Sequence, residues 1–486
     1  MAEFRWTEAQ QRAIDHGHGP LRIIAGAGSG KTATMTAHIA RLIQSGAAEP
    51  DQIVALTFTN AAAGELTERI QHALGDSSIQ VWSGTYHSFG GQIVADGAQI
   101  LDLPAQPHLL SQVETWLIVR EILRDGIEIE QRDMANLGHA INELVGLVSR
   151  CKDELVTPND VRDYLATIPP DDDIHAAEMR DFLRVYESYV QRCHLRGAID
   201  FGDQIGLAVQ ALDTDPDLRA EYCDRYRYFV VDEYQDTNFA QAELVRRLAA
   251  PDFNLRVVGD PQQSIYRFRG AAVDNIERFG KEISNVTDVT LATNFRSHQD
   301  ILDVANRIVT ETELSTDLQA HQDRRGPRPV IAHATEWSDE VQWIAETLAA
   351  HRHEDALEMA VLVRKRKLLP SLARALDRAG VPYQVLGGQA LFEFAAVKDA
   401  IAVIRLMANP ADTTSAVRVL TSPRCGLNDR SVYALRDHLR SSNYIDSLRR
   451  IVADPPPDVD PVIVRAAHAF CEDLGSLVAV AGSQPV

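Results

Sequence analysis

The stretch "LRIIAGAGSGKTATMTAHIARLI", residues 21–43, decides the fold. Its opening, "LRIIA", predicts a short buried strand, and the following "TATMTAHIARLI" places Met35, Ile39 and Leu42 on one face of a helix. Between strand and helix lies "AGAGSGKT", whose glycines let several backbone N–H groups point at one anion. The start of the helix adds its positive end to the same point. The stretch therefore predicts an α/β fold with a phosphate-binding loop.

The loop and the helix start supply the candidate ligands for a nucleotide. Lys31 would reach the β and γ phosphates of ATP, and Thr32 would coordinate Mg²⁺. The strict loop pattern has glycine where this chain has Ala25. A glycine-rich turn that binds nothing is the alternative, and the Gly-Lys-Thr at the helix start argues against it. The other candidate loop ligands are Ala25, Gly26, Ala27, Gly28, Ser29 and Gly30.

A carboxylate pair follows a second apolar run. In "YFVVDEYQDTN", four apolar residues precede Asp232 and Glu233. Asp232 can hold the Mg²⁺ shell, and Glu233 can accept the proton of a water that attacks the γ-phosphate. Two further strands, at residues 53–58 and 255–260, also end in polar residues. Since open parallel sheets bind ligands at the carboxyl ends of their strands, we expect one site there.

The composition is that of a globular protein with more than one domain. Hydrophobic residues make up 45% of the chain and charged residues 24%, as in ordinary globular proteins. A chain of 486 residues is too long for one ordinary hydrophobic core. A net charge of −21 argues against DNA binding through overall charge but leaves a local basic groove open. The five cysteines have no C-x-x-C spacing, and no apolar run reaches the length of a membrane span. We therefore expect a cytoplasmic protein without a disulfide framework or a zinc module.

Six motifs occur in order: "AGAGSGKT", "ALTFTNAAAGEL", "GTYHSF", "VVDEYQDTN", "VGDPQQSIYRFRGA" and "NFRSHQDIL". Together they resemble the ordered motifs of the UvrD/Rep/PcrA family of superfamily 1 DNA helicases, and the resemblance extends from "TEAQQRAI" to "SPRCGL". It implies ATP hydrolysis between two RecA-like domains and 3′ to 5′ movement on single-stranded DNA. It also implies duplex junctions and proteins of DNA repair or replication as partners.

The resemblance assigns further roles at the nucleotide. Gln10 would read the adenine edge, and Phe295 in "NFRS" would stack on the adenine. Arg296 would reach across a cleft to the γ-phosphate as an arginine finger, and Gln263 would sense the loss of that phosphate. The alternatives are a helix-surface glutamine for Gln10 and a solvated or salt-bridged side chain for Arg296.

The resemblance also places DNA contacts on loops. Phe58, Tyr266 and Phe268 would stack on bases. Phosphate or sugar contacts would come from Thr59, Asn60, Tyr86, His87 and Arg269. Two alternatives stay open: Phe58 and Phe268 fill the core, and His87 is a structural histidine.

We expect two RecA-like domains, the second incomplete, each with a helical insertion. The expected parts are residues 1–90 and 198–282 (first domain), 91–197 (its insertion), 283–410 (second domain, N-terminal part) and 411–486 (start of the second insertion). Within the second domain, the patterns predict strands at residues 328–334, 359–364 and 382–387. In "IDFGDQI", Asp200 and Asp203 could be mistaken for a metal pair, but we interpret them as structural.

Two motifs that the resemblance implies are absent from the sequence: "T-x-H-x-x-K-G-L-E" and "Y-V-A-x-T-R-A", the second carrying another γ-phosphate arginine. Three explanations stay open: a fragment of a longer protein, a partner that supplies the rest, or a degenerate motor. We expect the chain alone to bind ATP, Mg²⁺ and single-stranded DNA but to turn over poorly. The rivals to a helicase are a nucleotide-dependent DNA-binding or partner-recruiting module, the motor of a helicase–nuclease and a small-molecule kinase.

Overall fold

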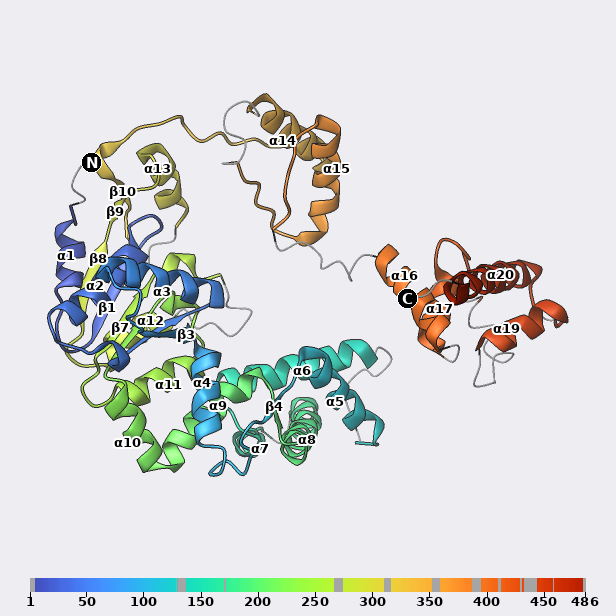
Figure 1. Ribbon diagram of the computed structural model, residues 1–486, viewed down its shortest axis with the longest axis horizontal. Helices are drawn as coiled ribbons and strands as arrows, with labels where there is room; N and C mark the ends of the chain where they lie inside the picture. Colours follow the sequence, from blue (N-terminus) through green and yellow to red (C-terminus); the bar gives the residue numbers. More distant parts are fainter. Residues whose placement is uncertain are drawn as a thin grey trace. The chain divides into compact units, whose positions relative to one another are not determined.

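The chain forms two compact units, Met1–Val330 and Ile331–Val486 (Figure 1). Among the described residues, no helix is long and apolar enough to cross a membrane. The computed structural model describes residues 5–127, 129, 137–169, 172–265, 274–309, 316–351, 359–386, 395–409, 412–428, 431, 444–457 and 459–483.

A six-stranded parallel sheet lies at the centre of the first unit, in the order β3-β2-β6-β7-β1-β8. The strands expected from the sequence, β1, β2, β6 and β7, are confirmed. We expected the second domain to begin at residue 283, but β8 still belongs to the first sheet, because it pairs with β1 from Leu21–Thr287 to Ala25–Leu291. The bounds are β1 (Leu21–Ala25), β2 (Ile53–Thr57), β3 (Trp82–Thr85), β6 (Tyr228–Val231), β7 (Leu255–Gly259) and β8 (Thr287–Leu291).

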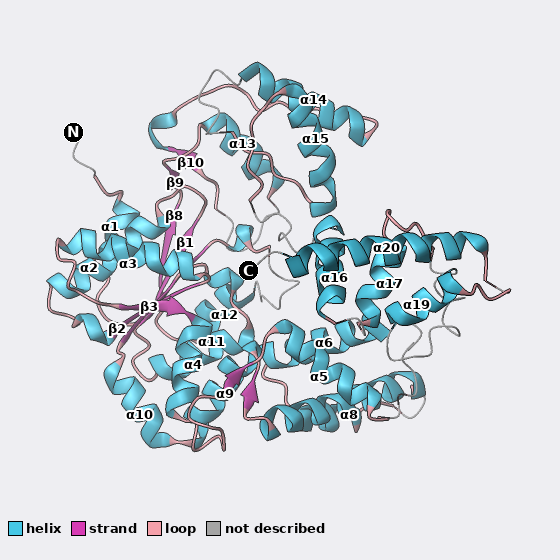
Figure 2. Cartoon of the chain, turned by 45° about the vertical axis from the view of Figure 1, so that its right-hand side comes forward, coloured by secondary structure: helices cyan, strands magenta, loops and turns pink. Residues whose placement is uncertain are grey.

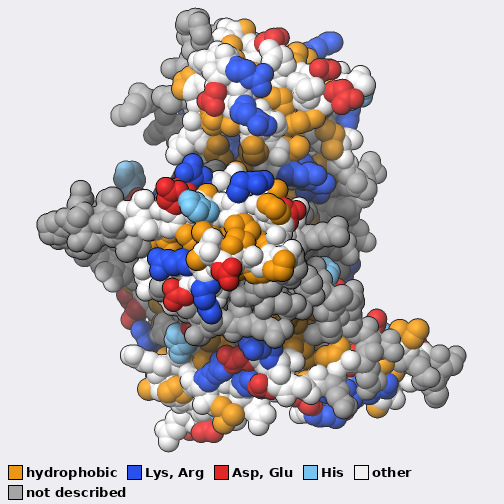
Figure 3. Space-filling view, turned by 90° about the vertical axis from the view of Figure 1, so that its right-hand side faces the viewer, with side chains coloured by type: hydrophobic (Ala, Val, Ile, Leu, Met, Phe, Trp, Pro, Cys, Tyr) orange, Lys and Arg blue, Asp and Glu red, His pale blue; other side chains and the backbone are white. Residues whose placement is uncertain are grey.

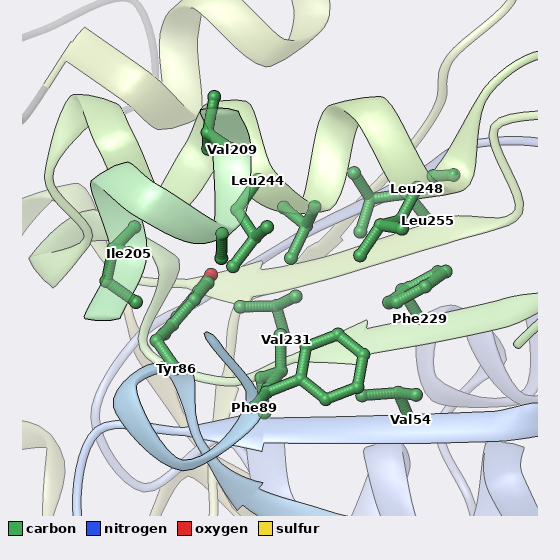
Figure 4. Packing of buried hydrophobic residues seen from close by; sticks show 14 of the residues in the cluster. Val54, Tyr86, Phe89, Ile205, Val209, Phe229, Val231, Leu244, Leu248 and Leu255 are labelled. Atoms are coloured by element: carbon green, nitrogen blue, oxygen red, sulfur yellow. The ribbon is translucent and has the colours of Figure 1, made fainter. Parts of the chain in front are cut away.

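Helices cover both faces of this sheet (Figure 2). Neighbouring strand residues point to opposite faces: Ile23 packs in the cluster that holds Met35, and Ile24 packs in the cluster of Phe89 and Phe229 that Figure 4 draws. One face carries α1 (Glu8–Ile14), α2 (Lys31–Gln44) and α3 (Asn60–Leu74). The other carries α4 (Tyr86–Asp96), α9 (Phe201–Thr214), α10 (Pro216–Arg225), α11 (Phe239–Ala249) and α12 (Asp274–Glu282).

The helical insertion has a hydrophobic core of its own, built around Ile118, Leu144 and Tyr189. The insertion was expected to begin at residue 91, but α4 continues to Asp96 and packs on the sheet, so the separate core begins after it. The elements of the insertion are β4 (His108–Leu109), α5 (Gln112–Arg124), α6 (Leu137–Asp153), α7 (Pro158–Leu165), α8 (Asp173–Leu195) and β5 (Ala198–Ile199).

A buried charge cluster joins this insertion to the sheet layer. Nζ of Lys152, on α6, lies 2.6 Å from Oδ2 of Asp200 and 2.7 Å from Oδ1 of Asp203, at the start of α9. Asp200 also accepts a hydrogen bond of 2.7 Å from the hydroxyl of Tyr189. Burial alone would lower the pKa of Lys152, but Asp203 and Asp200 raise it above its ordinary value. The structural interpretation of the two aspartates is therefore confirmed.

The second unit is helical in the part that the structure describes. The strands expected at residues 328–334, 359–364 and 382–387 do not form there, residue 387 being outside the described range. A strand needs a hydrogen-bonded neighbour, and the described residues supply none: Ile331, Leu362 and Leu386 are 90%, 95% and 85% exposed. The helices are α14 (Trp337–His351), α15 (Leu369–Ala379), α16 (Ala395–Ala408), α17 (Thr413–Thr421), α19 (Tyr444–Ala453) and α20 (Pro461–Ser483).

Candidate functional site

The phosphate loop joins β1 to α2, as the sequence predicts. Gly28 and Gly30 have φ angles of 70° and 84°, a region that favours glycine. A Cβ on Gly30 would lie 2.8 Å from Nε2 of Gln10, so the loop passes close to α1. Oγ of Ser29 donates a hydrogen bond of 2.7 Å to the carbonyl of Gly26, which closes the loop on itself. The backbone is thereby shaped around a space at the start of α2.

Gln10 lies beside this loop with its side-chain amide engaged. Oε1 accepts from the backbone N–H of Thr7 at 3.0 Å, and Nε2 donates to the carbonyl of Ser29 at 3.1 Å. A surface pocket of about 350 Å³ adjoins the loop and is lined by residues that include Thr7, Arg12, Ser29 and Thr293. A larger pocket of about 570 Å³ in the second unit contains none of the predicted site residues. Of these two pockets, only the smaller one is lined by a residue of the phosphate loop, Ser29, and the adenine contact of Gln10 stays a prediction.

The lysine of the loop and the carboxylate of the second motif are in direct contact. Nζ of Lys31 donates to Oε2 of Glu233 at 2.8 Å, and Nε2 of Gln235 donates to the same oxygen at 2.8 Å. Oε1 of Gln235 accepts from the backbone N–H of Asp260 at 2.9 Å. Nε2 of Gln263 donates to Oδ2 of Asp260 at 2.7 Å. One unbroken chain of polar contacts therefore runs from Lys31 to Gln263.

Gln235 was not identified as a site residue from the sequence. Its side chain is buried, and a Cβ on Gly259 would lie 2.5 Å from its Oε1. The glycine that ends β7 therefore makes room for this amide. The signal in the sequence was a glutamine between two acidic residues in "DEYQD", directly after a buried strand.

Two carboxyl groups after β6, those of Asp232 and Asp236, have raised pKa values. Burial and then the neighbouring Glu233 raise the pKa of Asp232 to about 6, while Lys31 acts in the opposite direction. The same two causes raise the pKa of Asp236 to about 6. A divalent cation would favour the ionised form of Asp232, and oxygen donors are the ligands that Mg²⁺ takes in proteins. Thr32 and Asp232 thus fit the metal predicted for them, which stays a prediction.

The "NFRS" segment lies against the phosphate loop within the first unit. The backbone N–H of Phe295 donates to the carbonyl of Gly28 at 2.9 Å, and the Phe295 ring contacts that of His321 at 4.8 Å between centroids. Arg296 is exposed beside it. We expected Arg296 to reach the γ-phosphate across a cleft between two domains. In the described structure its backbone instead belongs to the same compact unit as the loop.

The residues predicted to contact DNA differ in their exposure to solvent. Phe58, Thr59 and Asn60 follow β2 directly and are exposed at the same edge of the sheet. His87 is half-buried, and burial lowers its pKa. Tyr86 is 4% exposed, and Figure 4 shows its ring pointing into the core, so a DNA contact through its side chain is not supported. Tyr266, Phe268 and Arg269 lie outside the described residues.

Net charge alone describes the surface poorly. On the face drawn in Figure 3, Lys and Arg side chains lie among Asp and Glu side chains. An acidic protein can therefore present basic side chains locally, and contact with DNA has to be tested at named residues.

Comparisons with known proteins agree with this geometry. The model of the UvrD/REP helicase N-terminal domain matches residues 6–284, and that of the UvrD-like helicase C-terminal domain matches residues 289–455. ATP-dependent DNA helicase UvrD1 of Mycobacterium tuberculosis is 35% identical over 435 residues, which are 87% of this chain and 55% of that protein. UvrD1 of Mycobacterium leprae is 32% identical over 502 residues, 96% of this chain and 62% of that protein.

ATP-dependent DNA helicase PcrA of Leuconostoc citreum is 32% identical over 434 residues, which are 88% of this chain and 56% of that protein. The chain thus spans little more than half the length of these relatives. Since the first family model covers more than half of its residues, the chain belongs to the UvrD/REP helicase family.

Proposed function

We propose that the carboxyl edge of the first sheet binds and hydrolyses ATP with Mg²⁺, and that the complete protein uses this reaction to move 3′ to 5′ on single-stranded DNA. The observation that carries the proposal is the contact of Lys31 with Glu233 at 2.8 Å. It joins a phosphate-loop lysine, after β1, to a carboxylate that follows β6, two strands away in the same sheet. A lysine for the phosphates and a carboxylate for the attacking water suit phosphoryl transfer to water.

The first step is an exchange of partners at Lys31. Lys31 and Glu233 form an ion pair, and their side chains are 12% and 35% exposed. The phosphates of ATP would take Lys31 from Glu233. Glu233 is then available to accept the proton of the attacking water. Mg²⁺, held by Thr32 and Asp232, would neutralise charge that develops on the phosphate oxygens.

The second step passes from hydrolysis to the loop after β7. Glu233 is bonded to Gln235, which caps the backbone of Asp260, which in turn holds Gln263. We expect a change at Glu233 to reach Asp260, the partner of Gln263, through two hydrogen bonds. This arrangement supports the role proposed for Gln263 as a sensor of the γ-phosphate.

Single-stranded DNA is the proposed track, with duplex junctions and proteins of DNA repair or replication as further partners. The exposure of Phe58, Thr59 and Asn60 at the edge of the nucleotide site supports contact with a strand there. The relatives described above are named as DNA helicases, which supports DNA as the proposed substrate. His87 stays a proposed contact, together with Tyr266, Phe268 and Arg269.

One observation favours a second function for the chain by itself. The segments expected to form strands in the second unit are exposed and unpaired in the described structure. If these segments do not pair into a second sheet, we expect the chain to bind nucleotide and DNA but to transmit little force between domains. The alternative is therefore an ATP-dependent DNA-binding module, or the motor part of a helicase–nuclease, with little unwinding activity of its own.

Duplexes with a 3′ or a 5′ single-stranded tail separate these possibilities. Strand displacement is measured with the 486-residue chain, beside nucleotide and DNA binding by fluorescence. We expect binding of both ligands and slow hydrolysis, with little displacement. Robust displacement of the 3′-tailed duplex by the chain alone would contradict the incomplete-motor account. Displacement restricted to the 5′-tailed duplex would contradict the direction, and absence of nucleotide binding would contradict the proposed site.

A further inference from the structure

Asn294 is a buried amide between the phosphate loop and the turn that carries Phe295 and Arg296. It ends β9 (Thr293–Asn294), which pairs in parallel with β10 (Gln319–Ala320) in the first unit. No role was assigned to its side chain above, and the residue is 1% exposed. A polar side chain at such depth requires partners on both of its ends.

Both ends of the amide have partners. Nδ2 of Asn294 donates to the carbonyl of Ala27, in the phosphate loop, at 2.5 Å. Oδ1 accepts from the backbone N–H groups of Arg296 at 2.9 Å and Ser297 at 2.6 Å. The backbone adds a parallel link, since the N–H of Phe295 donates to the carbonyl of Gly28 at 2.9 Å. The turn is therefore fastened to two successive carbonyls of the loop.

The orientation of these carbonyls matters for an anion. In a planar trans peptide the C=O and the N–H point in opposite directions. Asn294 binds the carbonyl of Ala27, so the N–H of Gly28, in the same peptide unit, points away from Asn294. We call the side of the loop that faces Asn294 its outer side and the opposite side its inner side. A phosphate on that inner side meets a donor and no carbonyl oxygen.

The fit leaves no room for a side chain at the contact. A Cβ on Gly28 would lie 2.7 Å from Nδ2 of Asn294 and 2.7 Å from Cβ of Arg296. The φ of 70° at Gly28 adds a second reason for glycine. The loop and the turn are thus packed as one body rather than as two segments that meet only through a ligand.

We propose that Asn294 is a positioning residue, which holds Arg296 and Phe295 at the nucleotide by anchoring their turn to the outer side of the phosphate loop. The inference rests on the proposed function, because it needs a nucleotide in this loop. Its consequence concerns discrimination between nucleotides. Arg296 is assigned to the γ-phosphate, which ADP lacks, so Asn294 sets the preference of the site for ATP over ADP without touching either.

The test is the ratio of ADP to ATP dissociation constants, measured with a non-hydrolysable ATP analogue and ADP on the full chain. Arg296→Ala lowers this ratio, and we expect Asn294→Ala to lower it by a similar factor, about tenfold for a lost charge-assisted contact. The double variant should fall no further than Arg296→Ala alone, because contacts that act through one another are not additive. Additive losses, or equal losses for both nucleotides, would overturn the role.

Asn294→Asp separates the two ends of the amide. The aspartate keeps the acceptor for the N–H groups of Arg296 and Ser297 but has no donor for Ala27. A lower ratio in this variant assigns the effect to the anchor on the loop, and an unchanged ratio overturns the anchor. This variant also serves if thermal denaturation shows that Asn294→Ala does not fold.

Gln299→Ala is the matched control. Gln299, on α13 (Gln299–Ile308), accepts from the backbone N–H of Ala320 at 2.7 Å and so supports the same small sheet without touching the loop. We expect its ratio to stay at the wild-type value. If the wild-type chain binds neither nucleotide, the proposed function fails together with this inference. If it binds both and Asn294 does not alter the ratio, this inference alone fails.

Discussion

Nζ of Lys31 lies 2.8 Å from Oε2 of Glu233, a residue 202 positions further along the chain. The contact pairs the cation proposed for phosphate with the carboxylate proposed for water. ATP therefore competes with Glu233 for Lys31, and the first consequence is a prediction about affinity.

Glu233→Gln should bind ATP more tightly while hydrolysing it far more slowly. The amide cannot hold Lys31 as an ion pair, so the lysine is available to phosphate, and we expect about a three- to tenfold lower dissociation constant. Loss of the proton acceptor should slow hydrolysis by about 10²–10⁴-fold. Binding is measured with a fluorescent ATP analogue, and hydrolysis under single-turnover conditions.

Asp236→Asn is the control for that experiment. Asp236 is another acidic residue beside Glu233, and burial and then Glu233 raise its pKa. Asp236 makes no hydrogen bond to Lys31 in the contacts described above, and the charge of Lys31 acts on it only as a lesser influence on its pKa. The affinity of this variant for ATP should therefore change less than that of Glu233→Gln. A Glu233→Gln variant that binds ATP no more tightly than wild type would show that the ion pair does not oppose nucleotide binding.

Gln235→Glu should uncouple Glu233 from the loop that carries Gln263. The new carboxylate still accepts from the N–H of Asp260, but it faces the carboxylate of Glu233 without the donor that the amide provides. We expect single-turnover hydrolysis to slow by about tenfold, the scale of one unsatisfied buried contact, with ATP affinity little changed.

Ser264→Ala is the matched control for Gln235. Oγ of Ser264 donates to the backbone carbonyl of Gln235 at 3.2 Å, so it joins the same two segments without touching Glu233. Hydrolysis should be unaffected there. Equal slowing in both variants would mean that the Gln235 amide only stabilises the local fold.

Lys152→Met should destabilise the first unit. It leaves Asp200 and Asp203 buried without their cation, and removing one partner of a buried ion pair costs about 3–5 kcal/mol in the free energy of unfolding. Urea unfolding followed by circular dichroism measures the change. Lys281→Met, which removes an exposed lysine 3.9 Å from Glu277, should cost less than about 1 kcal/mol. Similar losses of unfolding free energy in the two variants would show that the buried ion pairs of Lys152 do not stabilise the first unit.

His38 should make the first unit less stable in mild acid. Its Nδ1 lies 3.2 Å from the carbonyl of Ile14, and its Nε2 accepts from Nε of Arg256 at 3.2 Å. Burial and then Arg256 lower the pKa of His38 from 6.5 to about 3. The unfolded chain therefore takes up the proton first as the pH falls, and the free energy of unfolding should drop by about 2 kcal/mol between pH 7.5 and pH 5 from this group.

Unfolding midpoints in urea across that pH range measure the effect. His38→Gln, which cannot take up a proton, should flatten the pH dependence, whereas His72→Gln at an exposed position should leave it unchanged. An unaltered slope in His38→Gln would mean that His38 is not the group that titrates.

The phosphate loop and the strands around it could be predicted because their signals are local. A short, mostly apolar run, a glycine-rich turn and a helix start at Lys31 follow one another in the chain, and the Asp232-Glu233 pair marks the end of another strand of the sheet. The structure adds a φ of 84° at Gly30, a backbone region that other residues rarely adopt.

The amides of Asn294 and Gln235 could not be predicted in this way. Each is defined by partners far away in the sequence, Ala27 for one and Asp260 for the other, and a glutamine or asparagine carries no periodic signal. The resemblance implies a DNA contact at Tyr86, whereas packing against the sheet turns the ring of Tyr86 inward, which the motif "GTYHSF" does not reveal. The strands predicted in the second unit do not form in the described structure, because a strand pattern in the sequence gives no information about whether a neighbouring strand exists to pair with it.

The central claim is that Lys31 and Glu233 form the hydrolytic site. Single-turnover phosphate release from ATP, with Mg²⁺ and excess chain, tests it most directly in wild type, Lys31→Ala and Glu233→Gln, with and without single-stranded DNA. The account predicts measurable release by wild type, faster with DNA, and a loss of at least about 10²-fold in both variants. Release by Lys31→Ala at the wild-type rate would contradict it.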